Sequence, residues 1–211
     1  MEKKRIVNII LLLTIGIVLT VLVINKRDDN AYATIKKDRK ESDCREFLSK
    51  FPDSEHAPSV RQILEEIEYQ DYSLPNDSQP YKEYYGSNYS YSYGRPSIKV
   101  KASNSSDVLV IVRFDNSQGE VAGHSYIRKG CSSSIYVPAD RTYQVFFYYG
   151  TGWYPKKEMA NGIRGGFLMD ESYSKDGSPM RLEWGESVTY TLTQVVHGNF
   201  STSHSNKNEF F

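Results

Sequence analysis

Residues 142–154 read Thr-Tyr-Gln-Val-Phe-Phe-Tyr-Tyr-Gly-Thr-Gly-Trp-Tyr, the most aromatic and β-prone stretch of the chain. Val, Phe and Tyr favour a pleated, buried surface. Side chains alternate between the two faces of a strand, so odd and even residues from 143 to 149 point in opposite directions. Both sets are mostly apolar, which predicts a central strand over residues 142–149 that is covered on both sides. Gly150 and Gly152 then allow the backbone to turn.

Shorter β-prone runs flank this strand, and turn-forming residues such as Asp115 to Gly119 separate them. The candidate strands are 98–102, 108–114, 121–128, 134–137 and 188–196. About six short strands at this spacing predict an all-β antiparallel sandwich over residues 98–211, either Ig-like or a small barrel. The aromatic end, Phe210-Phe211, is expected to dock on this domain because free apolar tails are unusual.

Composition limits the classes of partner and of site. The 26 basic residues balance 26 acidic ones, so the formal net charge is zero and no nucleic-acid partner is expected. Cys44 and Cys131 lack the close spacing of a metal site. Two interpretations stay open for them: a disulfide that joins two segments, or two isolated thiols, which we favour.

The N-terminus predicts a membrane anchor. Residues 6–24 are uncharged and, apart from Asn8, Thr14, Gly16 and Thr20, apolar, and at ~1.5 Å per residue they reach across a ~30 Å hydrocarbon core. Basic residues at 3–5 favour a cytoplasmic tail over residues 1–5, although Lys26 and Arg27 follow the span and weaken that charge argument. The β domain is then extracytoplasmic, and periplasmic if the cell is Gram-negative.

The rival interpretation is a cleaved signal peptide, because residues 31–33, Ala-Tyr-Ala, mimic a cleavage site. The charged run at 25–30 favours an uncleaved signal anchor.

Residues 30–70 predict two helices that fold into a hairpin. Apolar residues recur at helical spacing in both halves, at Cys44, Phe47, Leu48 and Phe51, and at Val60, Ile63, Leu64 and Ile67. Pro52 ends the first helix. Residues 47–57, Phe-Leu-Ser-Lys-Phe-Pro-Asp-Ser-Glu-His-Ala, resemble the inter-helix segment of tetratricopeptide-like repeats in bacterial envelope proteins. That resemblance covers about one repeat and implies a protein-binding surface where repeats stack; a simple stalk is the interpretation we favour.

Residues 71–97 are rich in tyrosine and are punctuated by Pro and Gly, with no helical period. Two interpretations follow: an aromatic adhesive surface, because tyrosine offers contact area with few rotors to freeze, or a flexible or loosely packed linker. We favour the linker, which separates the helical hairpin from the β domain.

A second resemblance covers most of residues 98–211. The segments that carry it are Ile135–Pro138, Thr142–Trp153, Gly165–Phe167 and Gly198–Thr202. Together they resemble a module in uncharacterised envelope proteins of Bacteroidetes-type bacteria. The resemblance implies a location and a fold, and it implies no catalytic residue.

The stretch from Gly150 to Gly166 is predicted to be a long loop, and long loops on a β scaffold often bind ligands. Trp153 and Tyr154 are the candidates for stacking on a sugar, and Lys156, Lys157 and Arg164 for contacting an anionic group. The alternative is that Trp153 folds back and caps the core.

Other polar residues predict no catalytic, metal or cofactor site. A glycoside hydrolase needs two carboxylates across a cleft, and the candidates Asp170, Glu171, Glu183 and Glu186 lie in turn-like contexts. The histidines at 124, 197 and 204 lack metal-ligand spacing.

The sequence therefore predicts a single-pass, membrane-tethered, non-enzymatic envelope module that binds a protein or a glycan through its β domain. The first alternative is a membrane-anchored hydrolase of envelope polymers. The second is a structural subunit of a membrane assembly that uses the helical hairpin as its contact.

Overall fold

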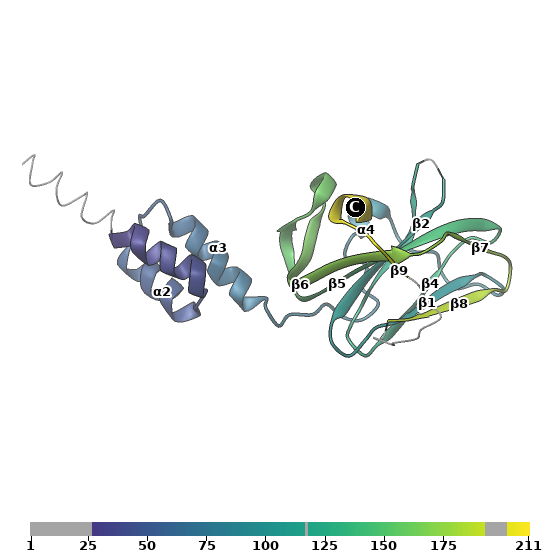
Figure 1. The fold of residues 1–211 in the computed structure, drawn as a ribbon, viewed down its shortest axis with the longest axis horizontal. Coiled ribbons are helices and arrows are strands. Elements are labelled where there is room, and N and C mark those ends of the chain that lie inside the picture. Colours follow the sequence, from purple (N-terminus) through teal and green to yellow (C-terminus); the bar gives the residue numbers. More distant parts are fainter. Residues whose placement is uncertain (1–26, 117, 193–201) are drawn as a thin grey trace, which may run out of the picture. The chain divides into compact units, whose positions relative to one another are not determined.

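A computed structural model describes residues 27–116, 118–192 and 202–211 of the chain (Figure 1). The chain divides into two compact units, Met1–Glu68 and Tyr69–Phe211. The predicted tail and membrane span, residues 1–5 and 6–24, lie outside the described residues. In the part of the chain that is described, no helix combines the length and the apolarity needed to cross a bilayer.

The first unit contains three helical segments where the sequence predicted two. Residues 27–38 are helical, and α2 (Glu41–Lys50) and α3 (Ala57–Glu68) follow. The break falls at Arg39, whose φ of 47° is left-handed and cannot continue a right-handed helix. The predicted apolar spacing identifies Cys44, Phe47, Val60 and Ile63 of the buried core, and the unpredicted helix 27–38 adds Ile35.

The two cysteines are free thiols that lie in different units. Cys44 is buried in the helical core, and Cys131 is exposed in the second unit. Burial, with the Asp43 carboxylate nearby, raises the pKa of the Cys44 thiol. Of the two interpretations of the cysteines, the structure therefore has the isolated thiols.

The second unit contains two β-sheets. The larger has the strand order β3-β2-β5-β6-β9, with β7 also paired to β5, and the smaller has the order β4-β1-β8. The strands are β1 (Ser97–Lys101), β2 (Asp107–Phe114), β3 (Val121–Ile127), β4 (Ser132–Tyr136), β5 (Arg141–Glu158), β6 (Arg164–Asp176), β7 (Met180–Leu182), β8 (Ser187–Thr191) and β9 (Thr202–His204). A β-rich domain is thus confirmed.

The prediction of purely antiparallel pairing is wrong at one place. β1 and β8 pair in parallel, with Ile98 opposite Val188 and Val100 opposite Tyr190. These two strands are far apart in the sequence, so no tight hairpin obliges them to run in opposite directions.

The prediction of a central strand covered on both faces is confirmed for β5. Tyr143, Val145 and Phe147 belong to a first core shared with β1, β2, β4 and β8. Phe146 and Tyr148 point the other way, into a second core on the opposite face of the larger sheet. Alternating side chains of one strand therefore join two separate apolar cores.

The predicted loop at 150–166 is instead the continuation of β5 and the start of β6, joined by the short helix η1 (Ala160–Gly162). Gly150 and Gly152 do not end the strand, because the β5–β6 register shifts between Tyr149 and Thr151 and pairing then resumes. Close packing explains the glycines. A Cβ on Gly150 would lie 2.4 Å from the Phe167 Cβ, and one on Gly152 would lie 2.6 Å from the Gln70 carbonyl oxygen.

The Tyr-rich linker predicted at residues 71–97 packs in part against the second core, through Leu74, Tyr81 and Tyr85. The Tyr126 backbone donates to the Ser78 carbonyl at 2.8 Å, and the Asp77 N–H donates to the Tyr126 carbonyl at 2.9 Å. Tyr81 is fully buried and precedes the short helix α4 (Lys82–Tyr85). This part of the segment therefore covers one face of the larger sheet.

The C-terminal helix α5 (Lys207–Phe210) covers the same face, beside α4 in Figure 1. Phe210 is fully buried and Phe211 is nearly so. The Arg113 guanidinium donates to the carbonyl oxygens of Phe210 at 3.1 Å and of Phe211 at 3.2 Å. The expected docking of the aromatic end is confirmed.

Gly152→Ala is expected to destabilise the β unit by about 3 kcal/mol, against about 1 kcal/mol for Gly162→Ala. Both glycines have positive φ, 69° and 74°, so an alanine strains the backbone at either position. Only Gly152 faces a neighbouring backbone, whereas Gly162 has open space within 4 Å. Urea unfolding of the two variants checks this, and equal losses would contradict the packing role of Gly152.

Candidate functional site

Trp153 and Tyr154, predicted to stack on a sugar, are both buried, with 2% and 4% of their surfaces exposed. The Trp153 indole lies edge-on to Tyr126 and Phe167, with ring centroids 5.4 and 5.3 Å apart. This is the position that the alternative interpretation gave it, as a cap on the core. Its indole therefore offers a ligand almost no surface for stacking.

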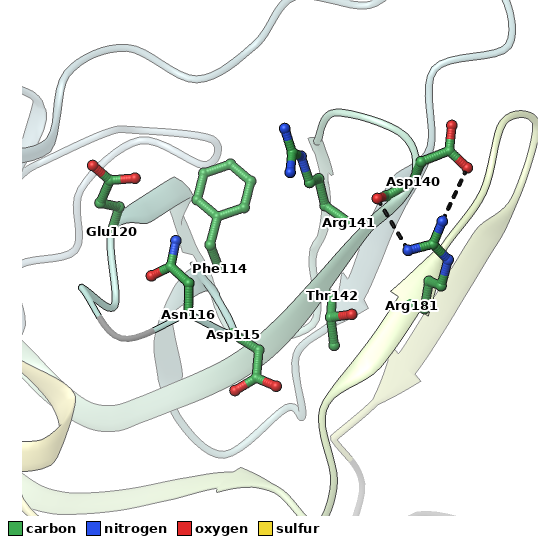
Figure 2. A pocket seen from close by; sticks show the side chains of 8 residues that line it. All are labelled: Phe114, Asp115, Asn116, Glu120, Asp140, Arg141, Thr142 and Arg181. Atoms are coloured by element: carbon green, nitrogen blue, oxygen red, sulfur yellow. Dashed lines mark hydrogen bonds and ion pairs between the residues drawn. The ribbon is translucent and has the colours of Figure 1, made fainter.

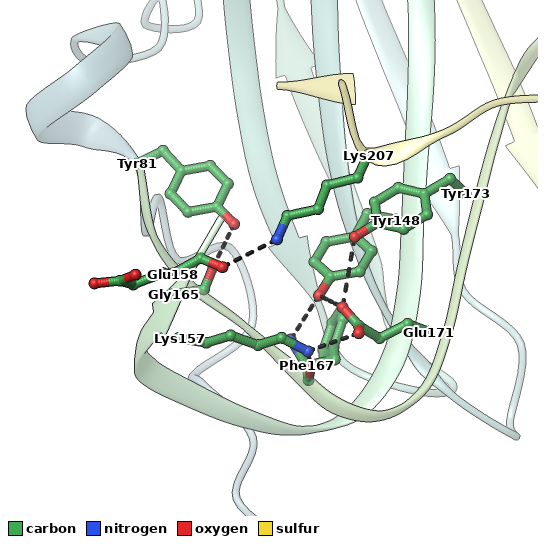
Figure 3. A network of polar contacts seen from close by, with 9 residues as sticks. All are labelled: Tyr81, Tyr148, Lys157, Glu158, Gly165, Phe167, Glu171, Tyr173 and Lys207. Carbon is green, nitrogen blue, oxygen red and sulfur yellow. Dashed lines mark hydrogen bonds and ion pairs between the residues drawn. The ribbon is translucent and has the colours of Figure 1, made fainter. Parts of the chain in front are cut away.

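Lys157 belongs to a polar network on the β5–β6 hairpin (Figure 3). Its Nζ lies 2.6 Å from the Glu171 Oε2 and also donates to the Phe167 carbonyl. The Glu171 Oε1 accepts from the Tyr148 hydroxyl, which in turn accepts from the Phe167 N–H at 2.8 Å. Burial and the Glu171 carboxylate raise the pKa of Tyr148, so its hydroxyl stays protonated as a donor. Each of these groups is engaged in holding the hairpin together.

Arg164 and Trp153 do line one hollow, of about 270 Å³, together with Pro80 and Pro155. Arg164 is exposed at its edge, and Lys156 is exposed elsewhere on β5. The structure therefore brings together two of the five predicted ligand residues. Lys157 is directed to Glu171 instead.

A hollow of about 470 Å³ lies beside β5 and β7 and is lined mostly by polar residues (Figure 2). Three carboxylates line it, those of Asp115, Glu120 and Asp140. The Asp140 carboxylate lies 3.5 Å from the Arg181 guanidinium, and Figure 2 shows the three carboxylates pointing in different directions. The hollow therefore lacks the facing acid and base that glycoside hydrolysis requires.

His124, a candidate metal ligand, is a core residue. It is fully buried, and its Nε2 accepts a hydrogen bond from the Tyr81 N–H at 3.1 Å. Burial lowers the pKa of its imidazole to about 4. His197 lies outside the described residues, and His204 ends β9.

The exposed aromatic residues form a different candidate site. Among the described residues, Trp184 is 63% exposed, Tyr93 86% and Tyr91 69%. With Tyr89, which is 41% exposed, they constitute what we call the aromatic surface. Single exposed apolar side chains are common, whereas a group of them marks a binding region.

Contacts between two segments hold the aromatic surface together. The Gly185 N–H donates to the Gly94 carbonyl at 2.7 Å, which joins the β7–β8 turn to the tyrosine-rich segment. Trp184 packs directly on Gly94, where a Cβ would fall 2.1 Å from the indole ring. A side chain at position 94 would displace the indole, so this glycine makes the arrangement possible.

The tyrosines of this surface are anchored by the smaller sheet and by an arginine. The ring centroids of Tyr91 and Tyr136 lie 5.4 Å apart, edge to face. The Arg95 guanidinium lies 5.5 Å from the Tyr89 ring centroid and donates to the Ser90 carbonyl at 2.6 Å. These contacts fix the segment that carries Tyr91 and Tyr93 without burying either ring.

Two carboxylates lie close to Trp184 in the sequence. Glu183 and Glu186 are exposed on either side of Trp184 in the β7–β8 turn. The Glu183 N–H donates to the Glu186 Oε2 at 2.6 Å, and Arg181 lies 3.9 Å from the Glu183 carboxylate. The surface therefore combines open aromatic rings with hydrogen-bond acceptors and donors.

Sequence reasoning missed Trp184 as a site residue. It assigned the stacking role to Trp153, which comes after the apolar run 142–149 in the sequence. In the structure this residue is buried in the second core. The available signal was the Trp184-Gly185 pair between two short strands, since a large aromatic residue in a turn has no strand face to fill.

Comparisons of this chain with protein-family models, with curated proteins and with solved structures found no match. The resemblances to tetratricopeptide-like repeats and to Bacteroidetes envelope proteins therefore stay predictions. Function is inferred below from the geometry of the chain itself.

Burial of His124 gives a prediction for pH. Its folded-state pKa, about 4, lies below the ordinary 6.5, so the unfolded chain takes up the proton first as the pH falls. The free energy of unfolding should therefore drop between pH 6.5 and 4, by up to about 3 kcal/mol from this group.

Urea unfolding across that pH range measures the effect. His124→Gln keeps an acceptor for the Tyr81 N–H but does not titrate, so its loss of stability should be smaller by that amount. An identical pH dependence in the variant and the parent chain would show that His124 does not cause it.

Proposed function

We propose that this chain is a single-pass, membrane-tethered, non-enzymatic module of the cell envelope that binds a glycan through the aromatic surface. Residues 6–24 are the anchor, the N-terminus is cytoplasmic and the β unit is extracytoplasmic. The apolar, uncharged run and the basic residues before it support the anchor. The observation that carries the binding role is the exposure of Trp184, at 63%, next to the tyrosine-rich segment.

The chemistry of the aromatic surface suits a sugar. A pyranose ring has apolar C–H faces and a rim of hydroxyl groups, so it needs a flat apolar contact beside polar partners. Trp184, Tyr91 and Tyr93 offer rings with few rotors to freeze. The exposed Glu183 and Glu186 carboxylates, in the same turn as Trp184, are acceptors for hydroxyl groups.

A glycan fits this surface better than a protein does. A stable protein interface buries about 800 Å² on each partner around a continuous apolar centre. The large apolar residues that are exposed in the described part of the chain are tyrosines, Trp184 and Met169. Aromatic rings without exposed Leu, Ile, Val or Phe favour stacking on sugars over the packing of aliphatic side chains.

The non-enzymatic part of the proposal rests on the hollow in Figure 2. Its carboxylates diverge, and Asp140 is paired with Arg181. Of the sequence-predicted carboxylates, Glu171 is bonded within the tyrosine network. A hydrolase would need two carboxyl groups facing each other across bound substrate, so this alternative has less support.

Trp184→Ala is expected to weaken glycan binding by about 30-fold, because truncating a tryptophan at the centre of a contact costs about 2 kcal/mol. Tyr93→Ala should weaken it in the same direction. The measurement is retention of the full chain, in detergent, on purified peptidoglycan sacculi and on immobilised envelope polysaccharide.

Tyr72→Ala is the matched control, because Tyr72 is 43% exposed but contacts Tyr69, outside the aromatic surface. Unchanged retention of Trp184→Ala would remove the binding role. Retention that disappears when the envelope fraction is treated with protease would identify a protein partner instead.

The anchor is tested by an alkaline wash of membranes, after which release of the intact chain would contradict it.

A further inference from the structure

Three side chains of metal-ligand type converge in the helical unit, whereas the proposed glycan site belongs to the second unit. Asp29 belongs to the helical residues 27–38, and Glu55 and His56 lie in the turn that leads into α3. One ligand atom from each residue lies within 4.8 Å of the others. The three ligands therefore come from two segments of the same unit.

The separations suit a single metal ion. The His56 Nε2 is 2.8 Å from the Asp29 Oδ1 and 4.0 Å from the Glu55 Oε1. Atoms bound to one zinc ion at about 2.0–2.2 Å are roughly 3–3.5 Å apart, and the two distances fall on either side of that range. The Glu55 side chain is 84% exposed, so a rotation of this side chain alone can bring its oxygen closer.

The imidazole is held in place for this role. The Tyr32 ring stacks on the His56 ring with centroids 4.2 Å apart and planes 12° from parallel. The His56 backbone N–H donates to the Ser54 Oγ at 3.1 Å, which fixes the turn. The side chain is 22% exposed, so most of it is packed while Nε2 faces the carboxylates. A ligand whose orientation is set by its neighbours binds a metal with less ordering cost.

The geometry points to a divalent metal site formed by Asp29, Glu55 and His56, with Zn²⁺ as its ion. One imidazole nitrogen and two carboxylate oxygens are ligands that Zn²⁺ accepts. Mg²⁺ and Ca²⁺ prefer oxygen alone. Water completes the coordination, because Asp29 and Glu55 are exposed. The ion joins residues 27–38 to the α2–α3 turn, and this role is independent of glycan binding.

The probe is Zn²⁺ alone, added to the full chain in detergent and measured by calorimetry and by competition with a chromophoric chelator. The chain is expected to bind one equivalent. Asp29→Asn and His56→Gln should each weaken binding at least about tenfold, since even loss of an outer-shell partner has that effect. Bound Zn²⁺ should also raise the thermal midpoint of the helical signal, because a ligand of the folded state stabilises it.

Asp53→Asn is the matched control, a carboxylate of the same turn that is not in the cluster. It should bind Zn²⁺ like the parent chain. Circular dichroism verifies that each variant keeps its helices, and Glu55→Gln, at the most exposed ligand, replaces any variant that does not. Zinc affinity unchanged in His56→Gln, or absent in the parent chain, would reduce Asp29 and His56 to an ordinary ion pair and overturn the proposal.

Discussion

The second unit depends on one constraint: strand β5 is apolar on both faces, so each face has to be covered. The smaller sheet covers one face, where Tyr143, Val145 and Phe147 are buried. No further sheet is present in the described residues to cover the other face. The tyrosine-rich segment and α5 do so instead, with Tyr81, Phe210 and Phe211 in the second core.

This constraint sorts the aromatic residues into two groups. The fully buried tyrosines Tyr81 and Tyr126 have partners for their hydroxyls, as a buried polar group requires. The Tyr81 hydroxyl donates to the Gly165 carbonyl at 2.7 Å, and that of Tyr126 donates to Asp107. Tyr91, Tyr93 and Trp184 remain in water. The glycan proposal follows from this sorting, because the second group is open to a ligand and the first is not.

Most of the strands could be predicted from the sequence because their signals are local. Alternation at residues 98–102, the apolar run at 108–114 and the turn after Phe114 each depend on neighbouring residues. β5 beyond Tyr149 could not be predicted in this way, because two glycines mimic a turn. Glycine is needed at these two positions because Phe167 and the Gln70 carbonyl lie close to them in space. Both neighbours are remote in the sequence.

The same limit applies to the candidate site. The residues 71–97 lack a period because their course follows the surface of a sheet that forms elsewhere in the chain, so composition alone suggested a tether. Trp153 looked available because an irregular loop was expected around it. Trp184 is exposed because Gly94, far away in sequence, holds its indole at the surface. Whether such side chains are buried or exposed depends on the tertiary fold, and sequence periodicity does not predict it.

Amide hydrogen exchange over residues 76–85 of the full chain tests most directly whether these residues cover the second face of the larger sheet. The Asp77 N–H is bonded to the Tyr126 carbonyl and the Tyr81 N–H to the His124 imidazole. Both amides should exchange at least about a hundredfold more slowly than in an unstructured peptide, within the range of β2. Exchange at the rate of a free peptide, with β2 still protected, would contradict the account.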